Sequence, residues 1–256
     1  PPRSTLFPYT TLFRSDFEGL KGIIAENDCK MLILCNPHNP VGRVWNEDEL
    51  IQLAEICYDN NILVVSDEIH SDLTLPGFRH RPFATVSEKA KENSITLMAP
   101  SKTFNIAGIV SSFAVIHNPE IRKQYLNYLA PRELDQATIY ALAATEAAYN
   151  YGEEWLDQAL AYIQKNIDFV ENYLKEYIPQ INAVKSEATF LVWLDCRALN
   201  LTQQELVDLF VNKAKLALND GTVFGKEGEG FMRLNVGTPL SNIEKALDNL
   251  RKALNS

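Results

Sequence analysis

The 256-residue sequence lacks the features of membrane, nucleic-acid-binding and metal-dependent proteins. No apolar run approaches the ~20 residues that a membrane helix needs, so we expect no membrane partner. No block of basic residues and no basic-aromatic stripe occurs, and the net charge is −9, so we expect no nucleic-acid partner. The four histidines have no spacing such as HExxH, which predicts no metal site. No GxSxG motif occurs, which argues against a hydrolase.

Cysteine is scarce, and no CxxC motif occurs among Cys29, Cys35, Cys57 and Cys196. We therefore expect reduced, mostly buried thiols and a cytoplasmic protein. Apolar residues make up 46% of the chain and charged residues 22%, which is ordinary for a globular protein with a sizeable core. The length allows one large domain or two modest ones.

The start of the sequence is unusual. Residues 5–15, TLFPYTTLFRS, are similar to the translation of a common DNA-sequencing adapter, and the sequence does not begin with Met. We therefore expect residues 1–15 to be an artefact and natural sequence to begin near Asp16, in the middle of a domain. The alternative is a natural loop or strand. Codons continuous with a natural upstream reading frame in the parent gene would contradict the artefact.

In the first part of the chain, predicted strands alternate with predicted helices. Apolar runs predict strands at 31–35, 62–66, 95–98 and 111–116. Helices are predicted at 16–28, from 46 onward, at 87–91, from 118 to 130 and at 133–149. Asn46 and Glu49 have the spacing of a capping box. The helix between the first two strands predicts a βαβ unit with a parallel strand pair.

The second part has a different pattern. A long amphipathic helix is predicted at 153–177, and strands are predicted at 190–194 and 231–236. Capping boxes at 202–205 and 241–244 predict the starts of two more helices. This is an α+β pattern, so we place a domain boundary within the long helix, giving domains 16–160 and 161–256.

Three polar residues each follow a predicted strand: Asn39, Asp67 and Lys102. Open α/β sheets bind ligands at the carboxyl ends of their strands, so these side chains are expected to converge at one edge. An amide, a carboxylate and an amine suit a pyridine cofactor that carries an aldehyde, a phenolic oxygen and a ring nitrogen.

Three motifs contain these residues: NPHNPVGR at 36–43, SDEIHSD at 66–72 and APSKTFNIAG at 99–108. Together they resemble the pyridoxal-phosphate (PLP) enzymes of the aspartate aminotransferase superfamily, and most of all its cystathionine β-lyase branch, MalY/PatB. The likeness covers essentially residues 16–256. It implies an α/β protein of PLP fold type I. A mostly parallel large-domain sheet is flanked by helices, and a smaller C-terminal α+β domain follows.

The resemblance assigns roles to the three residues. Lys102 is the lysine that joins the cofactor aldehyde and later moves the Cα proton; the alternative is a solvated surface lysine. Asp67 lies against the pyridine nitrogen; the alternative is a turn-capping aspartate. Asn39 donates to the phenolic oxygen and lies near the substrate. The alternative for Asn39 is a plain turn, in a loop whose Asn-Pro steps can hold a cis bond.

Three further residues follow from the resemblance. His70 stands where many relatives carry Tyr and would contact the phenolic oxygen or assist proton transfer; the alternative is a packed histidine. Ser101 would contact the cofactor phosphate; the alternative is a simple N-cap. Arg233, in GFMRLN at 230–235, would bind the substrate α-carboxylate; the alternative is a surface arginine on an edge strand.

The sequence departs from the wider superfamily at two positions. Val110 stands where many aminotransferases carry a phosphate-binding Arg, and Ala99 replaces a frequent phosphate-binding Ser. Both changes resemble the β-lyase branch. The family's N-terminal part also supplies an aromatic that stacks on the ring and a glycine-bearing phosphate turn, and this sequence contains neither. We therefore expect weak or no PLP binding by the chain as given.

The implied function is PLP-dependent carbon–sulfur β-elimination, which converts cystathionine or cysteine S-conjugates to a thiol, pyruvate and ammonia. The implied partners are a small amino-acid substrate and a second copy in a homodimer. Two alternatives remain open. One is a PLP-dependent aminotransferase, which shares the removal of the Cα proton. The other is an inactive fragment, or a parent protein that acts as a PLP-binding regulator.

Overall fold

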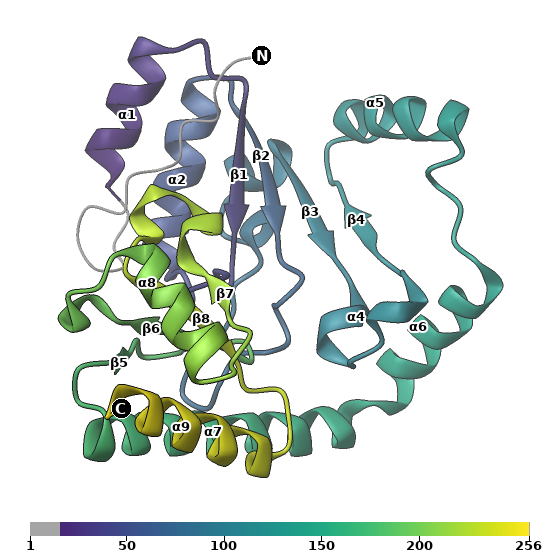
Figure 1. The fold of residues 1–256 in the computed structure, drawn as a ribbon. Helices are drawn as coiled ribbons and strands as arrows, with labels where there is room; N and C mark the ends of the chain where they lie inside the picture. The colour runs from purple at the N-terminus through teal and green to yellow at the C-terminus, as the bar shows by residue number, and fades with distance from the viewer. Residues whose placement is uncertain (1–15, 256) are drawn as a thin grey trace. The chain divides into compact units, whose positions relative to one another are not determined.

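The computed structural model describes residues 16–255, which form two compact units (Figure 1). Their residues are 16–37, 44–74 and 79–157 in the first unit, and 38–43, 75–78 and 158–255 in the second. The chain passes from one unit to the other inside a long helix, after Asp157. The domain ranges 16–160 and 161–256 stay a prediction, and the artefact expected at 1–15 lies outside the described residues.

The first unit is built on a four-stranded sheet in the order β1-β2-β3-β4. Its strands are β1 (Met31–Cys35), β2 (Leu63–Asp67), β3 (Ser94–Met98) and β4 (Phe113–Val115). The first three strands are parallel, and β4 runs antiparallel to β3. The predicted parallel strand pair is therefore confirmed.

Helices connect these strands and extend the first unit. They are α1 (Phe17–Glu26), α2 (Glu47–Asp59), α3 (Glu88–Glu92), α4 (Pro100–Thr103), α5 (Pro119–Leu129) and α6 (Ile139–Tyr151). The capping box of α2 is confirmed: Glu49 N donates to Asn46 Oδ1 and Asn46 N donates to Glu49 Oε2. Along α2, Leu50, Leu53 and Cys57 are buried in the core of this unit.

Helix α6 begins later than the sequence pattern predicts. The expected start was residue 133, but the helix runs from Ile139 to Tyr151. Glu133 has a left-handed backbone with φ 56°, which a helix does not tolerate. The N-cap is Thr138, whose side chain accepts a hydrogen bond from Ala141 N at 3.1 Å.

The second unit combines helices with an antiparallel sheet in the order β5-β6-β8-β7. The strands are β5 (Asn182–Ala183), β6 (Leu191–Asp195), β7 (Asn219–Asp220) and β8 (Phe231–Asn235). The helices are α7 (Glu153–Tyr177), α8 (Gln203–Asp208), which continues as a π-helix (Leu209–Lys213), and α9 (Leu240–Leu254). The capping box of Thr202 and Glu205 at the start of α8 is confirmed.

The capping box predicted at the start of α9 is wrong. Helix α9 begins at Leu240, its N-cap is Pro239, and no side chain caps it. Ser241 and Glu244 therefore lie inside the helix. In a capping box, Ser241 would accept from the amide of Glu244, but that amide lies beyond the first turn, where amides already donate to carbonyls of the helix.

Each unit has its own hydrophobic core. The first core includes Leu20, Leu34, Leu50, Leu53, Ile62, Val64 and Phe83. The second includes Ile167, Val170, Leu174, Val192, Leu194, Phe210, Met232 and Leu247. The mostly parallel sheet with its helices and the separate α+β unit confirm the predicted fold class. Among residues 16–255, no helix has the length and apolar character needed to cross a membrane.

Candidate active site

Asp67 is the last residue of β2, in the middle of the parallel part of the sheet. Its Cα pairs in register with Cys35 of β1 and Leu97 of β3, so three strands end side by side. The half-buried carboxylate accepts a hydrogen bond from Ile69 N through Oδ1 at 3.2 Å. Asp67 is thus held at the carboxyl edge of the sheet by the backbone that follows it.

Lys102 lies in the short helix α4, which directly follows β3. The side chain is half-buried, and within residues 16–255 its amine makes no hydrogen bond or ion pair. The next residue, Thr103, is buried and donates from Oγ1 to Asp72 Oδ2 at 2.9 Å. This bond ties the helix of Lys102 to the segment that follows Asp67. The two residues therefore follow the ends of adjacent parallel strands, where such sheets place ligands.

His70 and Ser101 are also in the first unit. His70 is buried in the turn after β2, with 3% of its surface exposed. Ser101 is the second residue of α4, whose N-cap is Ala99, so Ser101 is not an N-cap. Their roles toward a cofactor stay predictions.

Asn39 lies in the second unit, in the loop 38–43. The bonds Asn36-Pro37 and Asn39-Pro40 on either side are both cis. The loop is closed by two backbone bonds of 2.7 Å, from His38 N to Arg43 O and from Gly42 N to His38 O. Burial, and then the nearby charge of Arg43, lower the pKa of His38 to about 4.

Glycine is required at the end of this loop. Gly42 has φ +77°, and a Cβ there would lie 2.9 Å from Ala188 O. The Ala188 and Glu187 amides both donate to Gly42 O at 2.9 Å. The loop of Asn39 is therefore packed tightly on the backbone of the second unit.

Arg233 and Asn39 are brought together by the fold although 194 residues separate them. Arg233 Nη1 donates to Asn39 Oδ1 at 2.7 Å, and Nη2 donates to Asn219 Oδ1 at 2.7 Å. The first bond fixes which end of the Asn39 amide is oxygen and which is nitrogen. Phe224 packs against the guanidinium, 4.7 Å from its carbon to the ring centre.

Arg233 differs from an edge-strand surface residue. Its strand β8 pairs with β6 on one side and β7 on the other. The side chain is half-buried, and its Nε is buried without a hydrogen-bond partner among the described residues. Burial lowers the pKa of the guanidinium below its usual value. Such a partly satisfied cation can bind a carboxylate.

Sequence reasoning missed Asn219 and Phe224. Asn219 faces Arg233 in register across β7 and β8. Strand β7 is only two residues long, so it has no periodic pattern that could have indicated this pairing.

The two departures from the superfamily, Ala99 and Val110, lie on either side of Lys102 in the sequence. Ala99 is buried at the N-cap of α4. Val110 is 83% exposed, with a left-handed backbone of φ 54° that is rare for a β-branched residue. Within residues 16–255, no cluster of His, Cys, Asp and Glu could hold a metal ion.

Several known proteins are similar to this chain. The chain is 41% identical to cystathionine beta-lyase PatB of Bacillus subtilis (strain 168), covering 93% of the chain and 62% of PatB. It is 35% identical to protein MalY of Escherichia coli (strain K12), covering 93% of the chain and 61% of MalY. The crystal structure of cystalysin from Treponema denticola, which contains a pyridoxal 5'-phosphate cofactor, superposes with a TM-score of 0.90. That match has 37% sequence identity and covers 94% of this chain and 61% of cystalysin.

The chain thus spans less than two thirds of the length of these relatives. Residues 3–250 match the sequence profile of aminotransferase class I and II. This match, together with the relatives of PatB and MalY type, establishes that the chain belongs to the aminotransferase class I and II family.

Proposed function

We propose that the protein containing this chain is a PLP-dependent carbon–sulfur β-lyase that acts on cystathionine or cysteine S-conjugates. The observation that carries the proposal is the half-buried, unpartnered amine of Lys102, next to the strand that ends at Asp67. The names of the relatives support the reaction class, because PatB is a cystathionine beta-lyase.

The side chains of the first unit fit the cofactor. An aldehyde needs an amine with no competing partner, and Lys102 has none among residues 16–255. A protonated ring nitrogen needs an anion. Asp67 uses Oδ1 for Ile69 N, and Oδ2 has no donor in the described part of the chain. The Ser101 hydroxyl, proposed to contact the phosphate, makes no hydrogen bond there either.

Each residue then has its own role. Bound PLP supplies an electron-withdrawing ring that stabilises negative charge at the substrate Cα. Lys102 holds the cofactor and afterwards accepts the Cα proton. Asp67 keeps a proton on the ring nitrogen. Asn39 and His70 are proposed to contact the phenolic oxygen.

Arg233 is proposed to bind the substrate α-carboxylate. Asn39 and Asn219 hold the two Nη atoms, so the guanidinium plane is oriented before a substrate arrives. A planar guanidinium can then form charge-assisted bonds to a carboxylate.

The proposed reaction breaks the bond between Cβ and sulfur. The Cα proton passes to Lys102, and the sulfur leaves as a thiolate with the bonding electron pair. Water releases the remainder as pyruvate and ammonia. An aminotransferase would share the proton transfer to Lys102 but would keep the Cβ–S bond and require a keto-acid acceptor.

The first experiment tests the attachment of the cofactor. The parent protein is incubated with PLP, reduced with borohydride and mapped by peptide mass spectrometry. We expect the label at Lys102 and no label in Lys102→Ala. Lys123→Ala, which removes an exposed lysine of the same unit, should be labelled like the wild type. A label at another lysine, or none, would refute the proposal. We expect the 256-residue chain itself to trap little or no PLP.

The second experiment separates the two reactions. The parent protein is given cystathionine with no keto acid, and pyruvate and ammonia are measured. Their formation supports the lyase. An absolute requirement for a keto acid would show an aminotransferase instead. PLP trapping at Lys102 with neither reaction would favour a PLP-binding regulator.

Two further properties are proposed from the family likeness and the cysteines. The protein is a homodimer, which light scattering of the parent protein tests. It is cytoplasmic, in keeping with four cysteines that are all free.

A further inference from the structure

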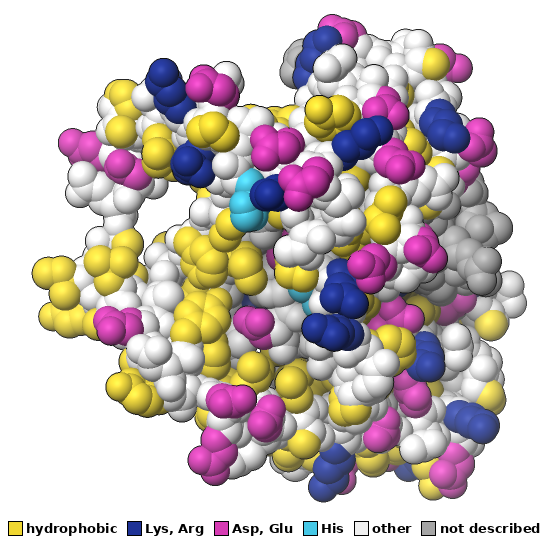
Figure 2. Space-filling model, turned by 180° about the vertical axis from the view of Figure 1, so that it is seen from behind, with side chains coloured by type: hydrophobic (Ala, Val, Ile, Leu, Met, Phe, Trp, Pro, Cys, Tyr) yellow, Lys and Arg dark blue, Asp and Glu magenta, His cyan; other side chains and the backbone are white. Residues whose placement is uncertain are grey.

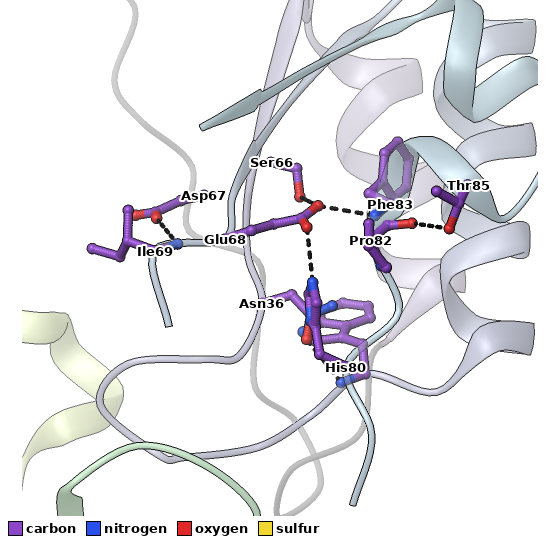
Figure 3. Close-up of polar contacts among 10 residues, drawn as sticks. Asn36, Ser66, Asp67, Glu68, Ile69, His80, Pro82, Phe83 and Thr85 are labelled. Carbon is purple, nitrogen blue, oxygen red and sulfur yellow. Dashed lines mark hydrogen bonds and ion pairs between the residues drawn. The ribbon is translucent and has the colours of Figure 1, made fainter. Parts of the chain in front are cut away.

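Glu68, the residue directly after Asp67, is a completely buried carboxylate (Figure 3). Its Oε1 accepts hydrogen bonds from Ser66 Oγ at 2.8 Å and Phe83 N at 2.9 Å. Its Oε2 lies 2.8 Å from Nε2 of His80, whose side chain is only 7% exposed. An ionised carboxylate only accepts hydrogen bonds, so opposite an ionised Glu68 the donor of this bond is His80 Nε2. Glu68 thus has three donors.

Packing alone does not explain a carboxylate at this position. Moving a carboxylate from water into a protein interior is unfavourable by several kcal/mol unless donors surround it. A leucine or methionine would fill similar volume without that penalty. A carboxylate, unlike an apolar side chain, forms directional hydrogen bonds. Its burial is favourable only when all three donors keep their positions around it.

The donors come from two separate stretches of chain. Ser66 belongs to β2, whereas His80 lies near the end of the 69–82 loop and Phe83 directly follows that loop. Residues 75–78 of this loop belong to the second unit, and the chain returns to the first unit at residue 79. Glu68 therefore joins the end of β2 to the residues that follow the return of the chain to the first unit at residue 79.

The same stretch of backbone holds Asp67. Glu68 N donates to Leu97 O at 2.9 Å, and Asp67 O accepts from Asn36 N at 3.0 Å. Ile69 N donates to the Asp67 carboxylate. The Asp67 and Glu68 side chains leave opposite faces of the strand end, as Figure 3 shows. Any rotation of the backbone at Glu68 would therefore turn Ile69 N away from Asp67.

We propose that Glu68 is a positioning residue: paired with His80 and bound by Ser66 and Phe83 N, it clamps the base of the 69–82 loop and so fixes the direction of the Asp67 carboxylate. The expected effect of Glu68 on cofactor binding rests on the proposed function. The clamp itself does not, because residues of this chain alone form its hydrogen bonds.

The first test uses the ligand-free chain and hydrogen–deuterium exchange resolved to single amides. Glu68→Gln and His80→Phe should speed exchange at Ile69 and Ser71 by about tenfold or more, which corresponds to the loss of one buried hydrogen bond. His80→Gln keeps a donor for Glu68, so exchange at Ile69 and Ser71 should stay as slow as in the wild type.

Thr85→Val is the matched control. It removes a hydrogen bond from Thr85 Oγ1 to the carbonyl oxygen of Pro82, the last residue of the loop, without touching Glu68, so exchange at Ile69 should not change. The proposal is overturned if Glu68→Gln and His80→Phe both exchange like the wild type. It is also overturned if Thr85→Val speeds Ile69 exchange as much as they do.

The second test uses the parent protein with PLP. Glu68→Gln and His80→Phe should weaken PLP binding about tenfold or more, while His80→Gln and Thr85→Val stay near the wild type. Unchanged PLP affinity in Glu68→Gln and His80→Phe would overturn the effect on Asp67. If the wild-type protein is not labelled at Lys102, the proposed function fails, and the exchange experiment still decides whether the clamp exists.

Discussion

At the scale of single residues, the contacts of a side chain determine which ligand groups it can bind. Arg233 has hydrogen bonds from both Nη atoms to amide oxygens, and Phe224 covers its face. Among residues 16–255, no carboxylate pairs with the Arg233 guanidinium. A cation that is oriented but not neutralised is suited to bind an anionic group of a ligand.

Arg233→Lys should weaken substrate binding in the parent protein. A lysine cannot reach both amides or form a planar, two-pronged contact, so we expect KM for cystathionine to rise about ten- to hundredfold with a smaller change in kcat. Arg251→Lys in α9, which changes an arginine that pairs with Asp248, is the control and should leave KM unchanged. Equal KM values for the wild type and Arg233→Lys would contradict the carboxylate role.

His38 should make stability depend on pH. Its pKa of about 4 lies below the ordinary 6.5, so the unfolded chain takes up the proton first as pH falls. Stability should therefore be full above about pH 6.5 and fall as pH drops toward 4. At about 1.4 kcal/mol per pKa unit, the loss should reach about 3 kcal/mol.

Urea unfolding between pH 7 and pH 4 measures this effect. His38→Gln should remove most of the pH-dependent loss, because glutamine does not titrate. His117→Gln, at an exposed histidine of the first unit, should keep it. The same slope in His38→Gln and the wild type would show that another group causes the loss.

At the scale of elements, two similar sequence patterns have different outcomes. Asn46 and Glu49 form a capping box at α2, whereas Ser241 and Glu244 do not form one at α9. The difference lies in the residue before the helix. Pro239 occupies the N-cap of α9, so its helix starts one residue before Ser241.

Paired substitutions test this difference. Asn46→Ala should lower the free energy of unfolding by about 1 kcal/mol, because an amide at the start of α2 loses its acceptor. Ser241→Ala, at an exposed serine that caps nothing, should change it by less than about 0.5 kcal/mol. Urea unfolding gives both values. A larger effect at Ser241 would contradict the absence of a capping box at α9.

At the scale of the molecule, the first unit leaves apolar surface exposed. Along β1, Ile33 is 73% exposed while its neighbour Leu34 is 3% exposed. In α6, Ile139 is 82% and Tyr151 is 84% exposed. Figure 2 shows hydrophobic side chains gathered on the side of this unit that carries α6. Apolar surface of this extent is typical of contact regions rather than of free surfaces.

Substitutions on the two faces of β1 should therefore differ. Leu34→Ala should lower the free energy of unfolding by about 2–5 kcal/mol, as expected for a cavity in a core. Ile33→Thr keeps a β-branched residue and should change it by less than about 0.5 kcal/mol, while lowering the binding of a hydrophobic dye by the folded chain. Comparable destabilisation by both would mean that Ile33 is buried in solution.

Much of the fold could be predicted from the sequence because its signals are local. The run from Met31 to Cys35, the Asn46 cap and the spacing of apolar residues in α7 each depend on neighbours within about two helical turns. Lys102 and Asp67 could be placed after strands for the same reason. The first turn of α6 could not, because the pattern at 133–138 is overridden by a left-handed residue and a later cap.

Local residue patterns were enough to predict the kinds of element, their order and the positions of the reactive side chains along the chain. The folded structure was needed to show that residues 38–43 and 75–78 belong to the second unit, that Asn39 contacts Arg233, and that Glu68 contacts His80. The physical reason is that these contacts depend on which distant segments are buried together. Hydrogen bonds across a long stretch of chain leave no period, cap or turn in the residues that make them.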